Sequence, residues 1–154
     1  MNDSNEHIRN VADFLEGLSS EHEFQITGSY GKFDLVSSKC TIRMTFDRYE
    51  SDVATIEFIN PNRPGNGMAL WMLCQIRSVK NAITDADRPF YGIGRTISAN
   101  FSDLLCGDFS IQGQYEQLRT TIFDKSMIVF RLPSSHPTRI KFDTGDISWL
   151  NDIA

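Results

Sequence analysis

Apolar and polar side chains alternate between residues 23 and 61. A period of two places successive apolar side chains on one face of an extended strand, so this region predicts four short β-strands. Residues 28–31, 37–39 and 50–52 separate the strands, and connections this short join antiparallel neighbours because a parallel crossover needs about a dozen residues. We therefore expect an antiparallel meander. Its apolar positions are Phe24 and Ile26, then Phe33 and Leu35, then Ile42, Met44 and Phe46, and finally Ala54, Ile56 and Phe58.

Helical spacing appears on both sides of this region. Asp3 and Glu6 have the spacing of a capping box, and apolar residues recur every three or four positions over residues 8–18, which predicts an amphipathic N-terminal helix. Proline, glycine and asparagine crowd residues 60–67, so the sheet should end there. Beyond that loop, the spacing of apolar residues predicts helices over residues 69–83, 97–105 and 111–122.

Three features of the second half bear on this interpretation. Trp71 lies off the apolar face of the helix predicted over residues 69–83. Gly92 and Gly94 should form a flexible entry into the helix that carries Ile97, because the third glycine and the preceding strand of a phosphate-binding loop are absent. Residues 127–132 fit either a strand or a continuation of the preceding helix.

The expected fold is therefore α+β, with a meander of about four strands, an N-terminal helix and several C-terminal helices packed on the sheet. A chain of 154 residues fits one domain, so we expect a single domain over residues 1–154. An apolar cluster near the C-terminus, formed by Ile147, Trp149 and Leu150, should pack onto the rest of the chain.

Charge and cysteine content narrow the classes of function. The chain has 15 basic and 20 acidic residues and no basic cluster, which argues against a general nucleic-acid binder. Cys40, Cys74 and Cys106 lack the C-x-x-C spacing of zinc or redox sites and should be reduced thiols. The N-terminus lacks the features of a secretory signal, and no apolar run approaches about 18 residues, so we expect a cytoplasmic protein that does not enter the membrane.

Only three histidines could serve as a general base, namely His7, His22 and His136. None lies in a recognisable catalytic motif, so we expect no catalytic site. Two alternatives stay open. One is a small hydrolase in which His136 meets an acidic partner in the fold, and the other is a ligand-binding or scaffold module with a roomy apolar pocket between sheet and helices.

Metal and cofactor binding are not expected either. Asp85, Asp87, Asp103 and Asp108 could together supply oxygen ligands, but they lack the spacing of an EF-hand and are typical of solvated turn carboxylates. Arg43 could contact RNA, although pairing with Glu57 across two strands accounts for it without a ligand.

Several stretches resemble immunity proteins of bacterial contact-dependent growth inhibition systems. They are Phe-Asp-Arg-Tyr-Glu at residues 46–50, Tyr-Gly-Ile-Gly at 91–94, Phe-Ser-Asp-Leu-Leu-Cys-Gly-Asp-Phe-Ser at 101–110 and Tyr-Glu-Gln-Leu at 115–118. The resemblance implies a small cytoplasmic protein without catalysis of its own. Such a protein binds the C-terminal toxin domain of a delivered effector, often a nuclease, and blocks its activity.

The resemblance carries no set of contact residues, so these are inferred from chemistry. Acidic side chains at turns would attract a basic toxin surface, and aromatic side chains near them would anchor it. The predicted partner-binding residues are Asp47, Tyr49, Glu50, Asp52, Trp71, Asp85, Asp87, Tyr91, Asp103 and Asp108.

Overall fold

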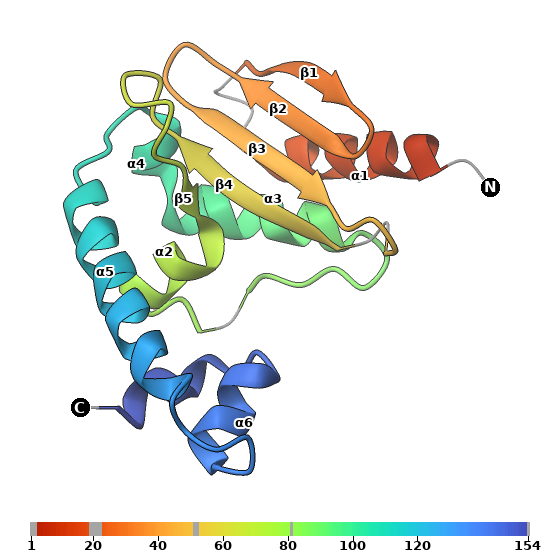
Figure 1. Cartoon of the computed structure of the whole chain (residues 1–154). Coiled ribbons are helices and arrows are strands. Elements are labelled where there is room, and N and C mark those ends of the chain that lie inside the picture. The colour runs from red at the N-terminus through yellow and green to blue at the C-terminus, as the bar shows by residue number, and fades with distance from the viewer. Residues whose placement is uncertain (1–2, 19–22, 51–52, 81, 154) are drawn as a thin grey trace. The chain divides into compact units, whose positions relative to one another are not determined.

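The computed structural model describes residues 3–18, 23–50, 53–80 and 82–153 (Figure 1). The chain divides into two compact units, residues 1–112 and residues 113–154, which are treated separately below. The first helix, α1 (Asp3–Gly17), confirms the predicted N-terminal helix. The side chain of Asp3 lies outside the described part, and so does the predicted capping box.

A five-stranded antiparallel sheet forms the centre of the first unit, in the order β1-β2-β3-β4-β5. The four strands predicted from the alternating pattern are confirmed. The structure adds a fifth strand of two residues, too short to show a period in the sequence. The strands are β1 (Gln25–Ser29), β2 (Lys32–Val36), β3 (Thr41–Phe46), β4 (Ala54–Ile59) and β5 (Met68–Ala69).

One face of the sheet carries the core. The strand register aligns Phe33, Met44 and Ile56 in one row, and the next row consists of Leu35, Ile42 and Phe58. All six side chains are buried. Helices α1 and α3 (Pro89–Asn100) cover this face (Figure 1). Alternation therefore sets which side of the sheet receives the helices.

Gly92 and Gly94 lie inside α3, so the prediction that they form a flexible entry to a later helix is wrong. A Cβ at Gly94 would overlap the carbonyl oxygen of Phe14, and a Cβ at Gly17 would overlap the carbonyl oxygen of Tyr91. A Cβ at Gly92 would lie 2.5 Å from the carbonyl oxygen of Ile83. Gly17 and Gly94 let the backbones of α1 and α3 touch where they cross, and Gly92 lets residues 83–85 approach the other side of α3.

Of the other predicted helices, one ends earlier than its apolar spacing predicts and one is broken in two. Helix α2 (Leu70–Ile76) stops well before residue 83, because Ser78 has a φ of 54° and turns the chain out of the helix. The helix predicted over residues 97–105 is the end of α3 followed by α4 (Ser102–Leu105), with a break at Phe101, whose φ is −133°.

Tyr30 and Gly31 form the two-residue turn between β1 and β2. Their φ angles are 57° and 84°, the combination found in type I′ hairpin turns. The Tyr30 side chain is fully exposed. Tyrosine rarely adopts this conformation, which costs about 1 kcal/mol in a residue with a Cβ.

The second unit contains α5 (Gln112–Val129), α6 (Pro137–Asp143) and the 3₁₀ helix η1 (Ile147–Asn151). Of the segment 127–132, whose alternatives were left open, residues 127–129 continue α5 and residues 130–132 form a turn beyond it, so the segment is not a strand. Trp149 and Leu150 are buried against Val129. The predicted C-terminal apolar cluster is thus the core of this unit.

We predict that Gly94→Ala lowers the free energy of unfolding by about 1 to 3 kcal/mol, because the new methyl group must push two helix backbones apart. Urea unfolding followed by circular dichroism measures the change. Gly113→Ala is the matched control, since Gly113 also lies in a helix but a Cβ there meets no atom within 4 Å. That control should be neutral or up to about 1 kcal/mol more stable. Equal stability of Gly94→Ala and the wild-type protein would contradict the assigned crossing.

Candidate protein-binding site

A groove of about 550 Å³ lies beside β4 in the first unit. We call it the β4 groove. Strand β4 forms one wall, α2 and the segment after it form the other, and α3 contributes one residue. Its lining residues are Ala54, Thr55, Ile56, Leu70, Trp71, Cys74, Gln75, Val79 and Ile93.

Trp71 is the most prominent side chain of this groove. Helix α2 buries Met72 and Leu73 in the core. Trp71 lies off that apolar face, as the sequence predicts, and 50% of it is exposed. Leu70 and Ile93 also line the groove and are half-buried. An exposed indole on an apolar wall is chemistry that suits a protein partner.

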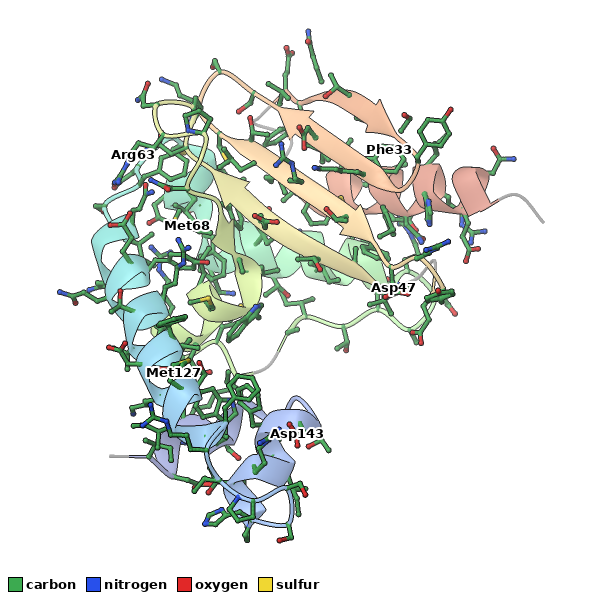
Figure 2. The ribbon with its side chains drawn as sticks, viewed as in Figure 1. Phe33, Asp47, Arg63, Met68, Met127 and Asp143 are labelled. Carbon is green, nitrogen blue, oxygen red and sulfur yellow. The ribbon has the colours of Figure 1, made fainter. Side chains whose placement is uncertain are left out.

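The loop between β3 and β4 carries the acidic part of the site. The Asp47 carboxylate (Figure 2) accepts hydrogen bonds from the backbone N–H groups of Tyr49, at 2.7 Å, and Glu50, at 3.0 Å. The Asp47 N–H donates to the Val53 carbonyl at 2.7 Å and closes the loop. Tyr49 and Glu50 are thereby held in an exposed position.

This loop and the β4 groove are neighbours along β4. A smaller hollow of about 290 Å³ is lined by residues of the loop and by Thr55, which also lines the β4 groove. The structure therefore brings Asp47 to the same part of β4 as the groove, whereas Tyr49 and Glu50 follow Asp47 in the exposed loop and line neither hollow. Asp52, which the sequence analysis placed with them, lies outside the described residues.

Asp85, Asp87 and Tyr91 surround the start of α3 and line neither hollow. The Asp85 carboxylate accepts from the backbone N–H groups of Asp87, at 3.1 Å, and Arg88, at 2.9 Å, so it shapes the turn into the helix. The Arg88 guanidinium lies 4.6 Å from the centre of the Tyr91 ring and also binds Asp13 of α1 at 3.1 Å. Tyr91 is half-buried under this ion pair rather than a free anchor.

Asp103 has a structural role instead of an exposed one. Its carboxylate accepts two hydrogen bonds from Arg77, at 2.8 Å and 2.5 Å. The same guanidinium donates to the Asn100 carbonyl at 2.6 Å and lies 5.1 Å from the centre of the Phe101 ring. Hydrogen bonding to Arg77 holds the pKa of Asp103 below its ordinary value.

Asp108 closes the C-terminal end of α4. Its backbone N–H donates to the Asp103 carbonyl at 2.9 Å, and the N–H of Gly107 donates to the Leu104 carbonyl at 3.1 Å. With Gly107 at a φ of 88°, this is a Schellman motif. The Asp108 carboxylate then accepts from the Ser110 N–H at 3.0 Å. Asp108, like Asp103, is occupied within the fold.

Arg43 lies across from Glu57 on β4, as predicted, but donates its hydrogen bonds to Asp34 on β2. Its Nε and Nη2 donate to the two carboxylate oxygens of Asp34 at 2.8 and 3.1 Å. Glu57 lies opposite Arg43 in the strand register, on the other side from Asp34. The hydrogen-bonded ion pair with Asp34 lowers the pKa of that carboxyl.

The cysteine thiols and histidine rings that could act as nucleophiles or general bases take part in the fold. Burial raises the pKa of the Cys40 thiol to about 12 and also raises that of Cys74, so both thiols stay protonated at neutral pH. The His136 Nδ1 accepts the Thr138 N–H at 3.1 Å and caps α6. The His7 ring stacks on Phe46 with the ring centres 4.4 Å apart. Among the described residues, no group of three or more His, Cys, Asp or Glu side chains is placed to hold a metal ion.

Sequence reasoning missed most of the groove. Val79 belongs to the predicted apolar pattern, but nothing in its spacing distinguishes a groove wall from core. Ile93 stands between the two glycines that we expected in a loop. Ala54 and Ile56 follow the strand period, which indicates the buried face and not the open edge.

No protein-family model, curated protein or solved structure matches this chain. In the part of the chain that the structure describes, no helix is both long enough and apolar enough to cross a membrane.

We predict that Asp103→Asn lowers the unfolding free energy at pH 7 by about 1 kcal/mol, since one member of a half-exposed ion pair is removed. It should also flatten the dependence of stability on pH. The pKa of Asp103 is depressed in the folded state, so its contribution is complete above the unfolded value of about 3.9 and is lost as the pH falls through the lower folded value. Urea unfolding between about pH 2 and 7 measures this effect.

Asp87→Asn is the control for this series. It removes the same charge as Asp103→Asn, but from an exposed side chain. Its pH profile should follow that of the wild-type protein. If Asp103→Asn and Asp87→Asn give the same profile, the ion pair with Arg77 does not stabilise the fold.

Proposed function

We propose that this chain binds and neutralises a toxin domain, in the manner of an immunity protein, and that the β4 groove and the β3–β4 loop form the contact surface. The observation that carries the proposal is the half-exposed Trp71 on an apolar groove that shares Thr55 with a hollow beside an acidic loop. Interfaces gain most of their binding energy from such anchors, and charge around them steers the partner.

The distribution of charge supports the same partner. Residues 113–154 contain equal numbers of acidic and basic residues, so the whole net charge of −5 arises from residues 1–112, which hold the groove. Nucleases bind phosphate with basic surfaces, and an acidic unit is complementary to them. The sequence resemblance to immunity proteins points to the same class of partner.

The proposed contact set is smaller than the set inferred from sequence. It comprises Trp71 as the apolar anchor, Tyr49 as a second ring, and Glu50 as the exposed carboxylate, with Asp47 holding the loop. Asp103 and Asp108 are left out because their carboxylates stabilise the fold.

A small-molecule-binding module is the second candidate. The volume of the β4 groove falls within the range of about 300 to 1,000 Å³ that ligand pockets occupy. An open groove with an exposed tryptophan fits a protein better, since small-molecule sites bury most of the ligand surface.

We predict that the wild-type protein restores growth of bacterial cells that produce the toxin domain encoded beside its gene, and that Trp71→Ala abolishes the rescue. Loss of a central anchor should weaken binding by about 30-fold or more in titration calorimetry with an inactive toxin variant. Thermal unfolding of Trp71→Ala should resemble that of the wild-type protein.

Phe123→Ala is the matched control, because Phe123 is an exposed ring in the second unit, 65% accessible. This variant should rescue growth and bind as the wild-type protein does. The proposal is wrong if the wild-type protein neither binds the toxin domain nor protects the cells, and its site is wrong if Phe123→Ala fails while Trp71→Ala protects.

A further inference from the structure

The backbone N–H and C=O groups of successive β4 residues point alternately toward β3 and toward the opposite edge of the strand. The strand register shows the direction for each residue. The Phe46 N–H of β3 donates to the Gly31 carbonyl next to β2, at 2.7 Å. Thr45, one residue earlier, must then direct its backbone groups toward β4, where it pairs with Thr55. Ala54 and Ile56, the neighbours of Thr55, therefore point their backbone N–H groups away from β3.

Strand β5 covers only part of this outer edge. It pairs with Glu57 and Phe58 and no further, because the chain turns into α2 at Leu70. No described strand pairs with Ala54 on that side. The N–H and C=O of Ala54 and the N–H of Ile56 thus lie along the wall of the β4 groove.

We infer that the β4 groove takes an extended segment of the partner, which adds to the sheet as a strand beside Ala54. The inference rests on the proposed function for the identity of the partner and adds the way in which it binds. An open strand edge offers a row of donors and acceptors that another extended chain can satisfy.

The lining of the groove determines the chemistry of that segment. Side chains of an added strand alternate between the two faces of the sheet. Those on the helix-covered face would meet Val79 and Ile93 and should be apolar. At the end beside the β3–β4 loop, the exposed Glu50 favours a lysine or arginine.

A helix is a poorer occupant of the same groove. Its backbone groups are already bonded within the helix, so docking it would bury the Ala54 groups without partners. An unpaired buried backbone group is unfavourable, whereas an extended segment supplies both a donor and an acceptor. The open edge therefore favours an extended ligand over a helical one, whereas an apolar groove alone would accept either.

Ala54→Pro tests the inference directly. The Ala54 N–H points away from β3, so proline removes the donor of the open edge while the pairing of Thr45 with Thr55 is kept. Ala54→Val is the matched control, because it enlarges the same side chain and keeps the N–H. The probe is a random nine-residue peptide library displayed on phage and selected against the wild-type protein.

The selected peptides should show alternating apolar residues with a basic residue near one end. Their synthetic copies should bind wild-type protein, and should bind Ala54→Pro at least about tenfold more weakly than Ala54→Val, which isolates the loss of the N–H from the larger side chain. Circular dichroism checks that Ala54→Pro folds. If it does not fold, scanning the peptide with N-methyl groups replaces it, and loss of binding at alternate positions is expected.

Three results would overturn the inference: no enriched peptide, apolar residues at helical spacing in the enriched peptides, or binding that neither Ala54→Pro nor N-methylation weakens. The assay uses no toxin, so it separates this inference from the proposed function. Growth rescue without peptide selection would contradict strand addition alone, and peptide binding without growth rescue would contradict the toxin as the partner.

Discussion

Burial of a single face of the sheet is the constraint on which the rest of the first unit depends. Two rows of apolar side chains on β2, β3 and β4 have to be covered, and α1 and α3 provide the cover. The helices protect a face and leave the edges of the sheet untouched. At the β4 edge, β5 is too short to complete the cover, and the β4 groove lies where it stops.

The acidic residues illustrate how structural needs come before binding in a small protein. The carboxylates of Asp47, Asp85 and Asp108 each accept hydrogen bonds from backbone N–H groups in a turn. The Asp103 carboxylate accepts hydrogen bonds from Arg77. Aspartate favours such turns because its short side chain reaches the following N–H groups. A carboxylate at a turn is therefore weak support for a partner, whereas the exposed Glu50 and Trp71 have no comparable structural task.

Sequence alone predicts the strands well, because β2, β3 and β4 alternate between one buried and one open face, although β1 is exposed along its whole length. It fails where long-range contact decides the local structure. Gly92 and Gly94 have the composition of a loop, but both lie in a helix, where the backbone of α1 lies against Gly94 and that of residues 83–85 lies against Gly92. The break at Ser78 depends on a single φ angle that no periodicity shows. The groove was missed for a related reason: it depends on where β5 ends, and two residues are too few to leave a pattern.

The contact between Gly17 and Gly94 bears on how the groove could adapt to a ligand. Ile93 lines the groove and is the direct neighbour of Gly94, whose backbone lies against that of α1. At this contact neither helix has a side chain, so there are no rotamers to rearrange directly beneath this wall, which is preorganised and loses little conformational entropy when a ligand binds. Adjustment to different ligands would fall to the Trp71 ring, which can still change its rotamer on the opposite wall.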